Sequence, residues 1–170
     1  MRKYLKAALF LLAAGIIFTA YYLRQEPSFD LCPFCDTKII QRQKFYEDTL
    51  SLALYSYKPI LEGHCLIVPK RHVERYEDLT LEEMTSLQQL IQRTHKAVSK
   101  ALGTRSYILL QKNGASVGQT VPHVHIHYIP REEHNSSILG LFFRFFINPI
   151  KSPISPEEMH DKTSAIASSF

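Results

Sequence analysis

The sequence predicts an α+β domain in which one long helix packs across a mostly antiparallel sheet of five strands. Five short runs rich in aromatic and aliphatic residues have the length and the bounding residues of strands. These runs cover residues 45–48, 50–57, 64–69, 106–111 and 123–129. A single long amphipathic run separates the third strand from the fourth, which favours one helix packed on one sheet over alternating strand–helix units.

The long helix is predicted over residues 80–102. Thr80 and Glu83 have the spacing of a capping box, in which each side chain accepts a hydrogen bond from the other residue's backbone, and Gly103 follows as a stop signal. An apolar stripe at helical spacing is formed by Met84, Leu87, Ile91, Val98 and Leu102. His95 points off this stripe, so we predict that it is a solvated surface histidine.

Three segments are predicted along the chain: residues 1–26 as an N-terminal anchor and linker, residues 27–135 as the domain, and residues 136–170 as a tail. The tail contains a strongly apolar run at residues 138–147, which is too short to span a membrane. This run can pack against the domain or a partner, or lie in a bilayer interface, and we favour packing. A final helix is predicted to begin after Ser155, with proline at its first position.

The N-terminal segment carries a run without charged residues, from residue 7 to residue 23, behind three basic residues. A helix over residues 7–23 is about 25 Å long, just enough to cross the hydrocarbon core of a bilayer. We therefore predict a single-pass membrane anchor. The positive-inside rule favours an extracytoplasmic domain, although the side stays open. A cleaved secretory signal and a buried core helix are the alternatives, but the cleavage positions are incomplete and the run lacks a polar face.

The charge distribution argues against a nucleic-acid partner. The formal net charge is +4, and residues 1–26 supply +3 of it. The remaining residues hold 16 basic and 15 acidic side chains, so they offer no excess of positive charge for a phosphate backbone. The three cysteines are too few for a disulfide framework and leave the redox compartment open.

Three histidines alternate with apolar residues in the run Val-Pro-His-Val-His-Ile-His-Tyr-Ile-Pro at residues 121–130. In a strand, residues two apart share a face, so His123, His125 and His127 line up on one side while the apolar residues between them pack on the other. Imidazole titrates near neutral pH and serves as nucleophile, general acid or metal ligand. The row predicts a functional site, and a metal-binding strand remains an alternative to catalysis.

Two further motifs accompany this row. The segment Gln-Lys-Asn-Gly-Ala-Ser-Val-Gly-Gln-Thr at residues 111–120 leads into it, and Glu-Gly-His-Cys-Leu-Ile-Val-Pro-Lys-Arg-His occupies residues 62–72. From residue 31 to residue 131 the chain resembles the histidine triad (HIT) family of nucleotide hydrolases and transferases. It is most similar to the fragile-histidine-triad-like members and to the bacterial members that begin with Cys-x-x-Cys. The resemblance implies the same α+β fold and a homodimer formed through the long helix and the sheet edge.

The resemblance also implies roles for particular residues. His125 is the residue that becomes covalently nucleotidylated, His127 contacts the α-phosphate, and His64 supports them from a neighbouring strand. Gln119 and Thr120 contact the phosphate and the leaving group. No metal is required for this step. The plainer alternatives are a histidine unconnected with the site for His64, and an ordinary hairpin connection for Gln119 and Thr120.

The substrate-binding positions depart from the family pattern at two places. Ser56 stands where the family usually has Asn or Asp that binds the ribose hydroxyls, and a serine makes one such contact instead of two. Lys112 stands where an Asn or Gln is common, and its charge either favours a more anionic substrate or points to solvent. Asn113 keeps the family residue.

A second constellation consists of Cys32, Cys35, His72 and His123. A Cys-x-x-Cys pair with two histidines is an ordinary ligand set for a closed, tetrahedral zinc site that stabilises the fold. In family members with the N-terminal cysteine pair, the corresponding four residues bind structural zinc. A redox pair is one alternative, disfavoured because no apolar strand precedes it and no convincing helix follows it. Unligated cysteines are the other.

We thus predict a membrane-anchored enzyme that attacks the α-phosphate of a nucleotide conjugate through His125. The resemblance implies a dinucleoside polyphosphate or a nucleoside phosphoramidate as the conjugate. A non-catalytic nucleotide-binding or scaffold module anchored to a membrane is the alternative. A zinc-dependent hydrolase that uses the histidine row as metal ligands is the third interpretation, and it predicts loss of activity on chelation.

Overall fold

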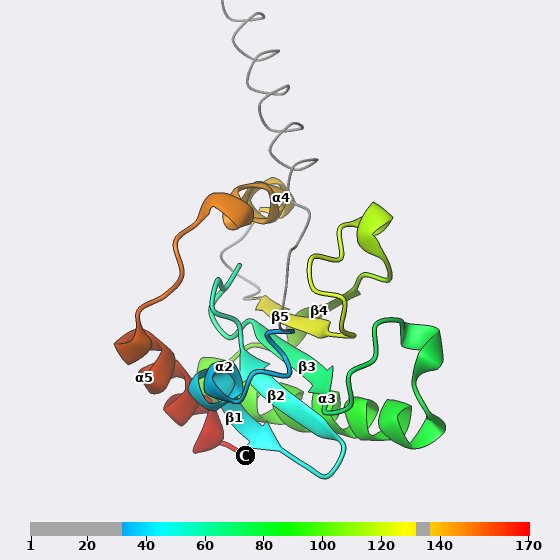
Figure 1. The fold of residues 1–170 in the computed structure, drawn as a ribbon. Helices are drawn as coiled ribbons and strands as arrows, with labels where there is room; N and C mark the ends of the chain where they lie inside the picture. Colours follow the sequence, from blue (N-terminus) through cyan, green and yellow to red (C-terminus); the bar gives the residue numbers. More distant parts are fainter. Residues whose placement is uncertain (1–31, 132–136) are drawn as a thin grey trace, which may run out of the picture. The chain divides into compact units, whose positions relative to one another are not determined.

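The computed structural model describes residues 32–131 and 137–170, and within them a five-stranded sheet carries helices on both faces (Figure 1). The strands run in the order β1-β2-β3-β5-β4, and every neighbouring pair is antiparallel. Their bounds are β1 Lys44–Glu47, β2 Ser51–Tyr55, β3 Cys65–Pro69, β4 Ser106–Gln111 and β5 Ile126–Arg131. The five predicted strands are confirmed, and the sheet is entirely antiparallel.

Four α-helices and three short 3-10 turns complete the described residues. The helices are α2 Thr37–Gln43, α3 Leu81–Leu102, α4 Ile138–Ile147 and α5 Pro156–Ala167. The turns are η1 Tyr76–Asp78, η2 Ala115–Val117 and η3 Asn148–Ile150. The long helix and the C-terminal helix are therefore confirmed, whereas α2 and the helical form of the apolar tail were not predicted.

Helix α3 has the ends that its sequence predicts. The Thr80 side chain accepts a hydrogen bond from the backbone of Glu83, the Glu83 side chain accepts one in return, and Gly103 closes the helix in the left-handed conformation. The helix covers one face of the sheet with a core that includes residues from every inner strand and from α5. Its members include Tyr55, Ile67, Leu87, Leu90, Val98, Tyr128 and Met159.

The opposite face is covered in part by the Cys-Pro-Phe-Cys segment and α2. Alternate residues of β2 and β3 point to this side, where they form a second apolar cluster with Phe34. Its buried members are Phe34, Leu52, Leu54, Leu66 and Val68. Strands β2 and β3 are therefore buried along their whole length, because both faces of the sheet are covered.

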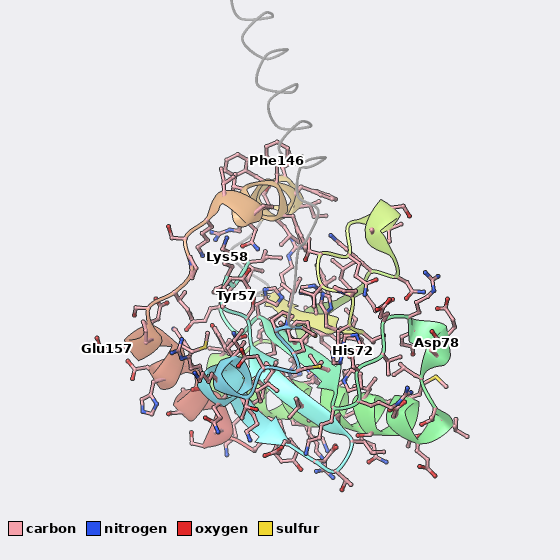
Figure 2. The ribbon with its side chains drawn as sticks, in the orientation of Figure 1. Tyr57, Lys58, His72, Asp78, Phe146 and Glu157 are labelled. Atoms are coloured by element: carbon pink, nitrogen blue, oxygen red, sulfur yellow. The ribbon has the colours of Figure 1, made fainter. Side chains whose placement is uncertain are left out.

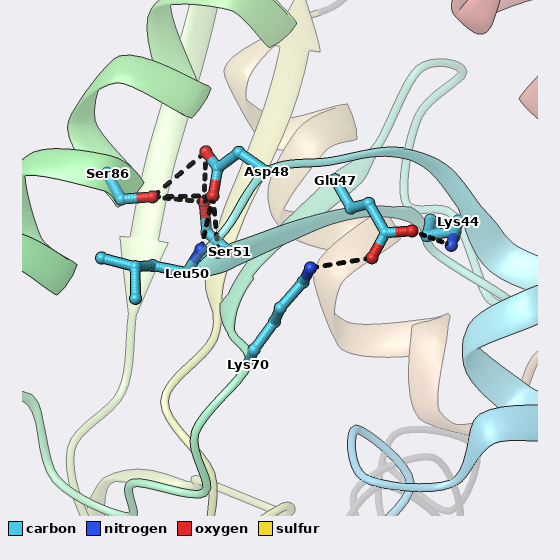
Figure 3. A network of polar contacts seen from close by, with 7 residues as sticks. All are labelled: Lys44, Glu47, Asp48, Leu50, Ser51, Lys70 and Ser86. Carbon is cyan, nitrogen blue, oxygen red and sulfur yellow. Dashed lines mark hydrogen bonds and ion pairs between the residues drawn. The ribbon is translucent and has the colours of Figure 1, made fainter.

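The turn between β1 and β2 is tied to α3 by one carboxylate (Figure 3). Asp48 accepts hydrogen bonds from the backbone N–H groups of Leu50 and Ser51 and from the hydroxyls of Ser51 and Ser86. Although burial favours the neutral acid, these hydrogen bonds lower the pKa of Asp48. The carboxylate thus fixes the hairpin to the helix.

Strand β5 begins later than predicted, at Ile126 instead of residue 123. Pro69 ends β3, and beyond it the backbone N–H of Val124 donates to the carbonyl of Val73, 2.6 Å away, rather than to a strand neighbour. His123 and His125 therefore precede the strand. The predicted division into faces is confirmed, since Val124, Ile126 and Tyr128 all lie in the core under α3.

The apolar tail packs less completely than predicted. In α4, Leu141 is buried and Phe145 half-buried, and both pack against a small cluster with Ile60 and Ile129. The other large apolar side chains of α4 are mostly exposed, from 56% for Phe146 to 80% for Leu139. The prediction that this run packs is therefore right for one side of the helix only.

The membrane location predicted from residues 7–23 is corrected here. Those residues lie outside the described part of the chain, so the structure gives no support for an anchor there. Within residues 32–131 and 137–170, no helix combines the length and the hydropathy that a membrane span needs. Helix α4 is apolar but has only 10 residues, about half of what a bilayer requires.

Candidate active site

His64 and His127 form a hydrogen-bonded pair at the centre of the sheet. The backbone N–H of Ile60 donates to Nδ1 of His64 over 3.1 Å, so a neutral His64 carries its proton on Nε2. That nitrogen lies 2.9 Å from Nδ1 of His127 and donates to it. His127 therefore keeps its own proton on Nε2, where it can donate to a ligand.

His125 is oriented by the backbone of the histidine row itself. Its Nδ1 lies 2.7 Å from the carbonyl oxygen of His123. Because a carbonyl only accepts, the proton of His125 is on Nδ1 and the lone pair on Nε2 is free. The centroid of the His125 ring lies 5.0 Å from that of His127. A free imidazole lone pair beside an N–H donor is an arrangement suited to nucleophilic attack on phosphorus.

Burial keeps these imidazoles neutral. Burial, with a smaller contribution from neighbouring histidines, lowers the pKa of His64 to about 3 and that of His127 to about 2. Burial also lowers the pKa of His125, although the hydrogen bond to the His123 carbonyl opposes this shift. All three rings are therefore uncharged at neutral pH, which a nucleophilic His125 requires.

The two residues that depart from the family pattern both lie at this site. Lys112 follows β4, and its Nζ donates to the carbonyl of Gly118 over 3.3 Å. Its charge acts on both His125 and His127 and lowers their pKa values after the larger effect of burial. Ser56 follows β2 and is buried, and its backbone N–H donates to the carbonyl of His64 over 2.9 Å. The cation of Lys112 is thus within electrostatic reach of the imidazoles.

Gln119 uses its side-chain amide to hold the loop before the histidine row. Its Oε1 accepts from the backbone N–H of Gly114 over 2.5 Å, and its Nε2 donates to the carbonyl of Glu74 over 3.0 Å. Gln119 is accordingly buried, whereas the following Thr120 is exposed. The substrate-binding role of these two residues stays a prediction.

Asn113 is engaged in a similar way. Its Oδ1 accepts from the backbone N–H of Tyr76 over 2.9 Å, and its Nδ2 donates to the carboxylate of Glu77 over 2.6 Å. The side chain therefore joins the loop after β4 to the turn η1. A direct contact between Asn113 and a substrate also stays a prediction.

Cys32, Cys35, His72 and His123 converge as their sequence pattern predicts. One ligand atom from each residue can be chosen so that all four lie within 4.8 Å of one another. Nδ1 of His123 is 3.3 Å from Sγ of Cys32 and 3.7 Å from Sγ of Cys35, and Nδ1 of His72 is 3.4 Å from the latter. His72 lies in the loop that follows β3 (Figure 2).

The chemistry of this donor set fits a zinc ion. Nε2 of His123 lies 3.0 Å from the carbonyl of Pro69 and donates to it, which leaves Nδ1 without a proton and turned toward the sulfurs. Burial lowers the pKa of His123 to about 4 and raises that of Cys32 to about 11. Cys32 is therefore a thiolate at neutral pH only beside a cation. Two thiolates and two neutral imidazoles are a common tetrahedral zinc set.

The prediction that no convincing helix follows the cysteine pair is wrong. Helix α2 begins at Thr37, directly after the cysteine pair, and Asp36 caps it by accepting from the backbone N–H groups of Lys38 and Ile39. A helix therefore does follow the two cysteines. The observation that still favours a metal site is the pair of histidine nitrogens beside the sulfurs.

Sequence reasoning missed two residues around the site, Ile60 and Phe34, and wrongly described His95, which lies outside it. Ile60 fixes the tautomer of His64 through its backbone, and no residue-type signal marks such a role. Phe34 contacts the ring of His125 at a centroid distance of 5.1 Å, and its place between two cysteines was the available signal. His95 was predicted to be solvated, and this is wrong: it is half-buried, with Nδ1 2.9 Å from the hydroxyl of Tyr128.

The fold and the site define a class of small α+β proteins in which a row of histidines at the start of a central strand meets a fourth histidine beside the neighbouring strand. A family model described as the HIT domain matches residues 37–134, which is more than half of the chain. The chain belongs to the HIT family.

Individual relatives agree with this assignment. The bis(5'-adenosyl)-triphosphatase of Dictyostelium discoideum is 38% identical over 136 residues, covering 78% of this chain and 88% of the relative. The adenosine 5'-monophosphoramidase of Schizosaccharomyces pombe is 36% identical over 132 residues, covering 75% and 90%. Among solved structures, a hypothetical histidine triad nucleotide-binding protein from Sulfolobus tokodaii has a TM-score of 0.65 at 26% identity, covering 81% of this chain and 91% of that one.

The chain spans about half the length, 52–54%, of three further curated relatives. The two curated relatives described above are named as a triphosphatase and a phosphoramidase. The prediction of a HIT-type enzyme is confirmed by these names. Neither name refers to a membrane, so the comparisons give the predicted anchor no support.

Proposed function

We propose that this protein cleaves a nucleotide conjugate at its α-phosphate through a covalent nucleotidyl intermediate on His125. The observation that carries the proposal is the chain of fixed protons: Nε2 of His125 is a free lone pair, while Nε2 of His127 carries a proton. The nucleophilic nitrogen of His125 and the hydrogen-bond donor of His127 therefore lie side by side, in a site whose rings are neutral at physiological pH. The reaction needs both.

In the first step, the lone pair on Nε2 of His125 forms a bond to the α-phosphorus, and the bond from phosphorus to the leaving group breaks. The electron pair of that bond departs with the leaving group, which takes up a proton from the solvent, and the nucleotidylated His125 ring carries a positive charge. In the second step, a water oxygen attacks the same phosphorus and the nitrogen–phosphorus bond breaks. The proton that the water loses passes to the solvent and replaces the one taken up by the leaving group. The electron pair of the nitrogen–phosphorus bond returns to Nε2 of His125, and a nucleoside monophosphate is released.

The substrate class rests on the relatives and on two residues. The names of the relatives refer to an adenosyl triphosphate conjugate and to an adenosine phosphoramidate. Lys112 places a positive charge near the imidazoles, which favours a leaving group with several negative charges, such as a polyphosphate. Ser56 offers a single hydroxyl toward the ribose, so nucleoside affinity is lower than with a carboxylate or an amide. Dinucleoside polyphosphates are therefore the preferred class.

The proposal includes zinc at Cys32, Cys35, His72 and His123. When bound, zinc would hold the two sulfurs as thiolates and fasten the Cys-Pro-Phe-Cys segment, residues 32–35, to the sheet. The protein orients the ligand ring: Nε2 of His123 donates a hydrogen bond to the Pro69 carbonyl, which keeps Nδ1 available as a ligand. Zinc takes no part in the transfer steps.

A homodimer is also proposed, through the β4 edge and α3. Strand β4 stands at the end of the sheet and has β5 as its strand neighbour, so its other edge is unpaired among the described residues. Tyr107 and Leu109 on this strand are 41% and 45% exposed. An unpaired edge that carries large apolar side chains is suited to pairing with a second copy. Sedimentation of the wild type and of Leu109→Asp tests this.

The deciding experiment traps the intermediate. The protein is mixed briefly with diadenosine triphosphate, quenched in alkali, which preserves a phosphoramidate bond, and analysed by intact-protein and peptide mass spectrometry. We expect an adenylyl adduct on His125. The His125→Ala variant lacks the adduct, and its kcat falls by at least about 10³-fold. His95→Ala is the matched control, because His95 is a half-buried histidine outside the site.

Several results would decide against the proposal. An adduct on a different residue, or full activity of His125→Ala, would contradict the mechanism. Tight binding without turnover of polyphosphate or phosphoramidate conjugates would favour the non-catalytic nucleotide-binding module. Loss of activity on chelation with an unchanged fold and an unchanged His125 ring environment would favour a metal-dependent hydrolase.

A further inference from the structure

The nucleophile and the metal-ligand set are joined by two direct connections. The first is His123, whose Nδ1 faces the cysteine sulfurs while its carbonyl oxygen holds Nδ1–H of His125 at 2.7 Å. The second is Phe34, which stands between the two cysteines in sequence. Its ring centroid lies 5.7 Å from that of His123, edge-on at 89°, and 5.1 Å from that of His125 at 51°.

Phe34 is held firmly in this place. It is 7% exposed and packs in the apolar cluster formed by Leu52, Leu54, Leu66 and Val68. These residues come from β2 and β3 and are themselves buried, so the ring moves only if the Cys-Pro-Phe-Cys segment leaves the sheet. A metal bound by Cys32 and Cys35, on either side of Phe34, would keep that segment in place.

His125 is confined by these contacts from several directions. Phe34 packs on one part of its ring, and the ring of His127 lies at a centroid distance of 5.0 Å and an interplanar angle of 71°. The His123 carbonyl fixes the remaining rotation by holding Nδ1–H. An in-line attack requires the lone pair on Nε2 to point at phosphorus, and a small misplacement of a reacting group lowers the rate steeply.

We propose that Phe34 is a positioning residue for His125, and that the metal held by Cys32, Cys35, His72 and His123 sets the orientation of the nucleophile through it. This inference rests on the proposed function and deepens it, because it gives the metal site an influence on rate without any contact with substrate. The expected signature is a loss in kcat with little change in KM, since substrate-binding groups are untouched.

The kinetic test compares three variants of the full chain with bound metal. Phe34→Leu removes the ring but stays apolar, Phe34→Tyr restores a ring, and Ile40→Ala is the control, because Ile40 packs on the same cluster from α2. With diadenosine triphosphate, we expect Phe34→Leu to slow adduct formation on His125 by about 10-fold at nearly constant KM. Phe34→Tyr and Ile40→Ala should stay within about 3-fold of the wild type. Metal content is measured for each variant and should be equal.

A second measurement is independent of turnover. Nitrogen NMR of the imidazole rings, recorded at mildly alkaline pH, reports which nitrogen of His125 carries the proton. We expect one fixed form, with the proton on Nδ1, in the metal-bound wild type, and averaged signals in Phe34→Leu. Careful removal of the metal should give the same averaging, and returning zinc should reverse it. If the metal-free protein unfolds, the Phe34 variants alone decide.

The inference is overturned if Phe34→Leu, with full metal content, keeps the wild-type rate and the wild-type His125 signals. It is also overturned if Ile40→Ala is as slow as Phe34→Leu, because the effect would then be one of general packing. Failure of the proposed function looks different: no adduct forms on His125 in the wild type, while the NMR comparison still tests the positioning.

Discussion

The face of the sheet under α3 and the face that carries the histidines are closed in different ways. Under α3, side chains of the strands and of two helices interlock in a continuous apolar core. On the other face, the apolar cluster around Phe34 gives way to imidazoles and cysteines, each with an assigned polar partner. A substitution of similar volume is tolerated in the first environment, whereas loss of one partner on the second face changes the protonation of the next group.

The histidine row shows how far this dependence goes. His123, His125 and His127 are chemically identical and two residues apart, yet Nδ1 of each meets a different partner: a thiol sulfur, a carbonyl oxygen and another imidazole. In the proposed function, the first ring offers a lone pair to a metal, the second offers one to phosphorus, and the third donates a hydrogen bond. The hydrogen-bond partner that fixes the tautomer differs from ring to ring: the Pro69 carbonyl at Nε2 of His123, the His123 carbonyl at Nδ1 of His125, and His64 at Nδ1 of His127.

Metal removal should give the largest effect on stability, because the histidine face lacks a continuous apolar core. We expect a chelator to lower the free energy of unfolding by about 3 kcal/mol or more. Urea unfolding with and without the chelator measures this, and elemental analysis confirms that zinc was present and then lost. An unchanged urea midpoint in the zinc-free protein would show that the four residues do not bind a stabilising ion.

The same substitution on the two faces should separate catalysis from packing. His64→Phe removes the donor to His127 and should lower kcat by about 100-fold, or about 2.7 kcal/mol in the barrier. His95→Phe removes a hydrogen bond to Tyr128 under α3. It should leave kcat within about 3-fold and cost about 1 kcal/mol of stability. Steady-state kinetics and urea unfolding of both variants test this. Equal kcat values would show that the tautomer relay has no catalytic role.

The two faces also differ in how well the sequence predicts them. Helix α3 follows from local signals alone, since its cap, its apolar stripe and its terminal glycine are all within residues 80–103. The convergence of Cys32, Cys35, His72 and His123 was predicted through the family resemblance. By contrast, the late start of β5 depends on Pro69 and Val73, which are distant in sequence, so no local pattern signals it.

Two further features could not be predicted for physical reasons. Helix α2 has seven residues and none of them is buried, so it leaves no apolar periodicity to detect. The tautomer of His64 is fixed by the backbone of Ile60, and every non-proline residue carries the same N–H group. Helix α4 differs from these two features, because here the sequence predicted more than the structure shows. Its apolar composition predicted packing, but among the described residues only one side of the helix is packed.

Substituting two glycines tests how tightly the face of the sheet under α3 is packed. Gly63 and Gly103 both have a positive φ, of 76° and 70°. A Cβ on Gly63 would lie 2.6 Å from a methyl of Leu102 and 2.9 Å from Pro130, whereas a Cβ on Gly103 meets nothing within 4 Å. Gly103→Ala should cost about 1 kcal/mol from backbone strain, and Gly63→Ala about 2–3 kcal/mol because overpacking adds to it. Equal losses in urea unfolding would contradict a tightly packed face.

The smallest effect concerns the ion pair between Arg71, in the loop after β3, and Glu83, on α3. The hydrogen bond from Arg71, followed by that from the backbone of Thr80, lowers the pKa of Glu83 from its usual 4.5 to about 2. The unfolded chain therefore takes up a proton at Glu83 at a pH where the folded chain does not. The resulting stability is present above pH 4.5 and is lost as the pH falls toward 2.

Because the Arg71 side chain is half exposed, solvent screens the pair, and we expect Glu83 to contribute about 1 kcal/mol to this pH dependence. Glu83→Gln should flatten the fall in unfolding free energy between pH 4.5 and 2, while Glu82→Gln, one residue earlier on the exposed side of α3, serves as the control. Urea unfolding at several pH values measures both. If both variants show the same fall in unfolding free energy with pH as the wild type, the charge of Glu83 contributes nothing to stability. Glu83 then acts in the helix cap through hydrogen bonds alone, and apolar packing holds α3 against the sheet.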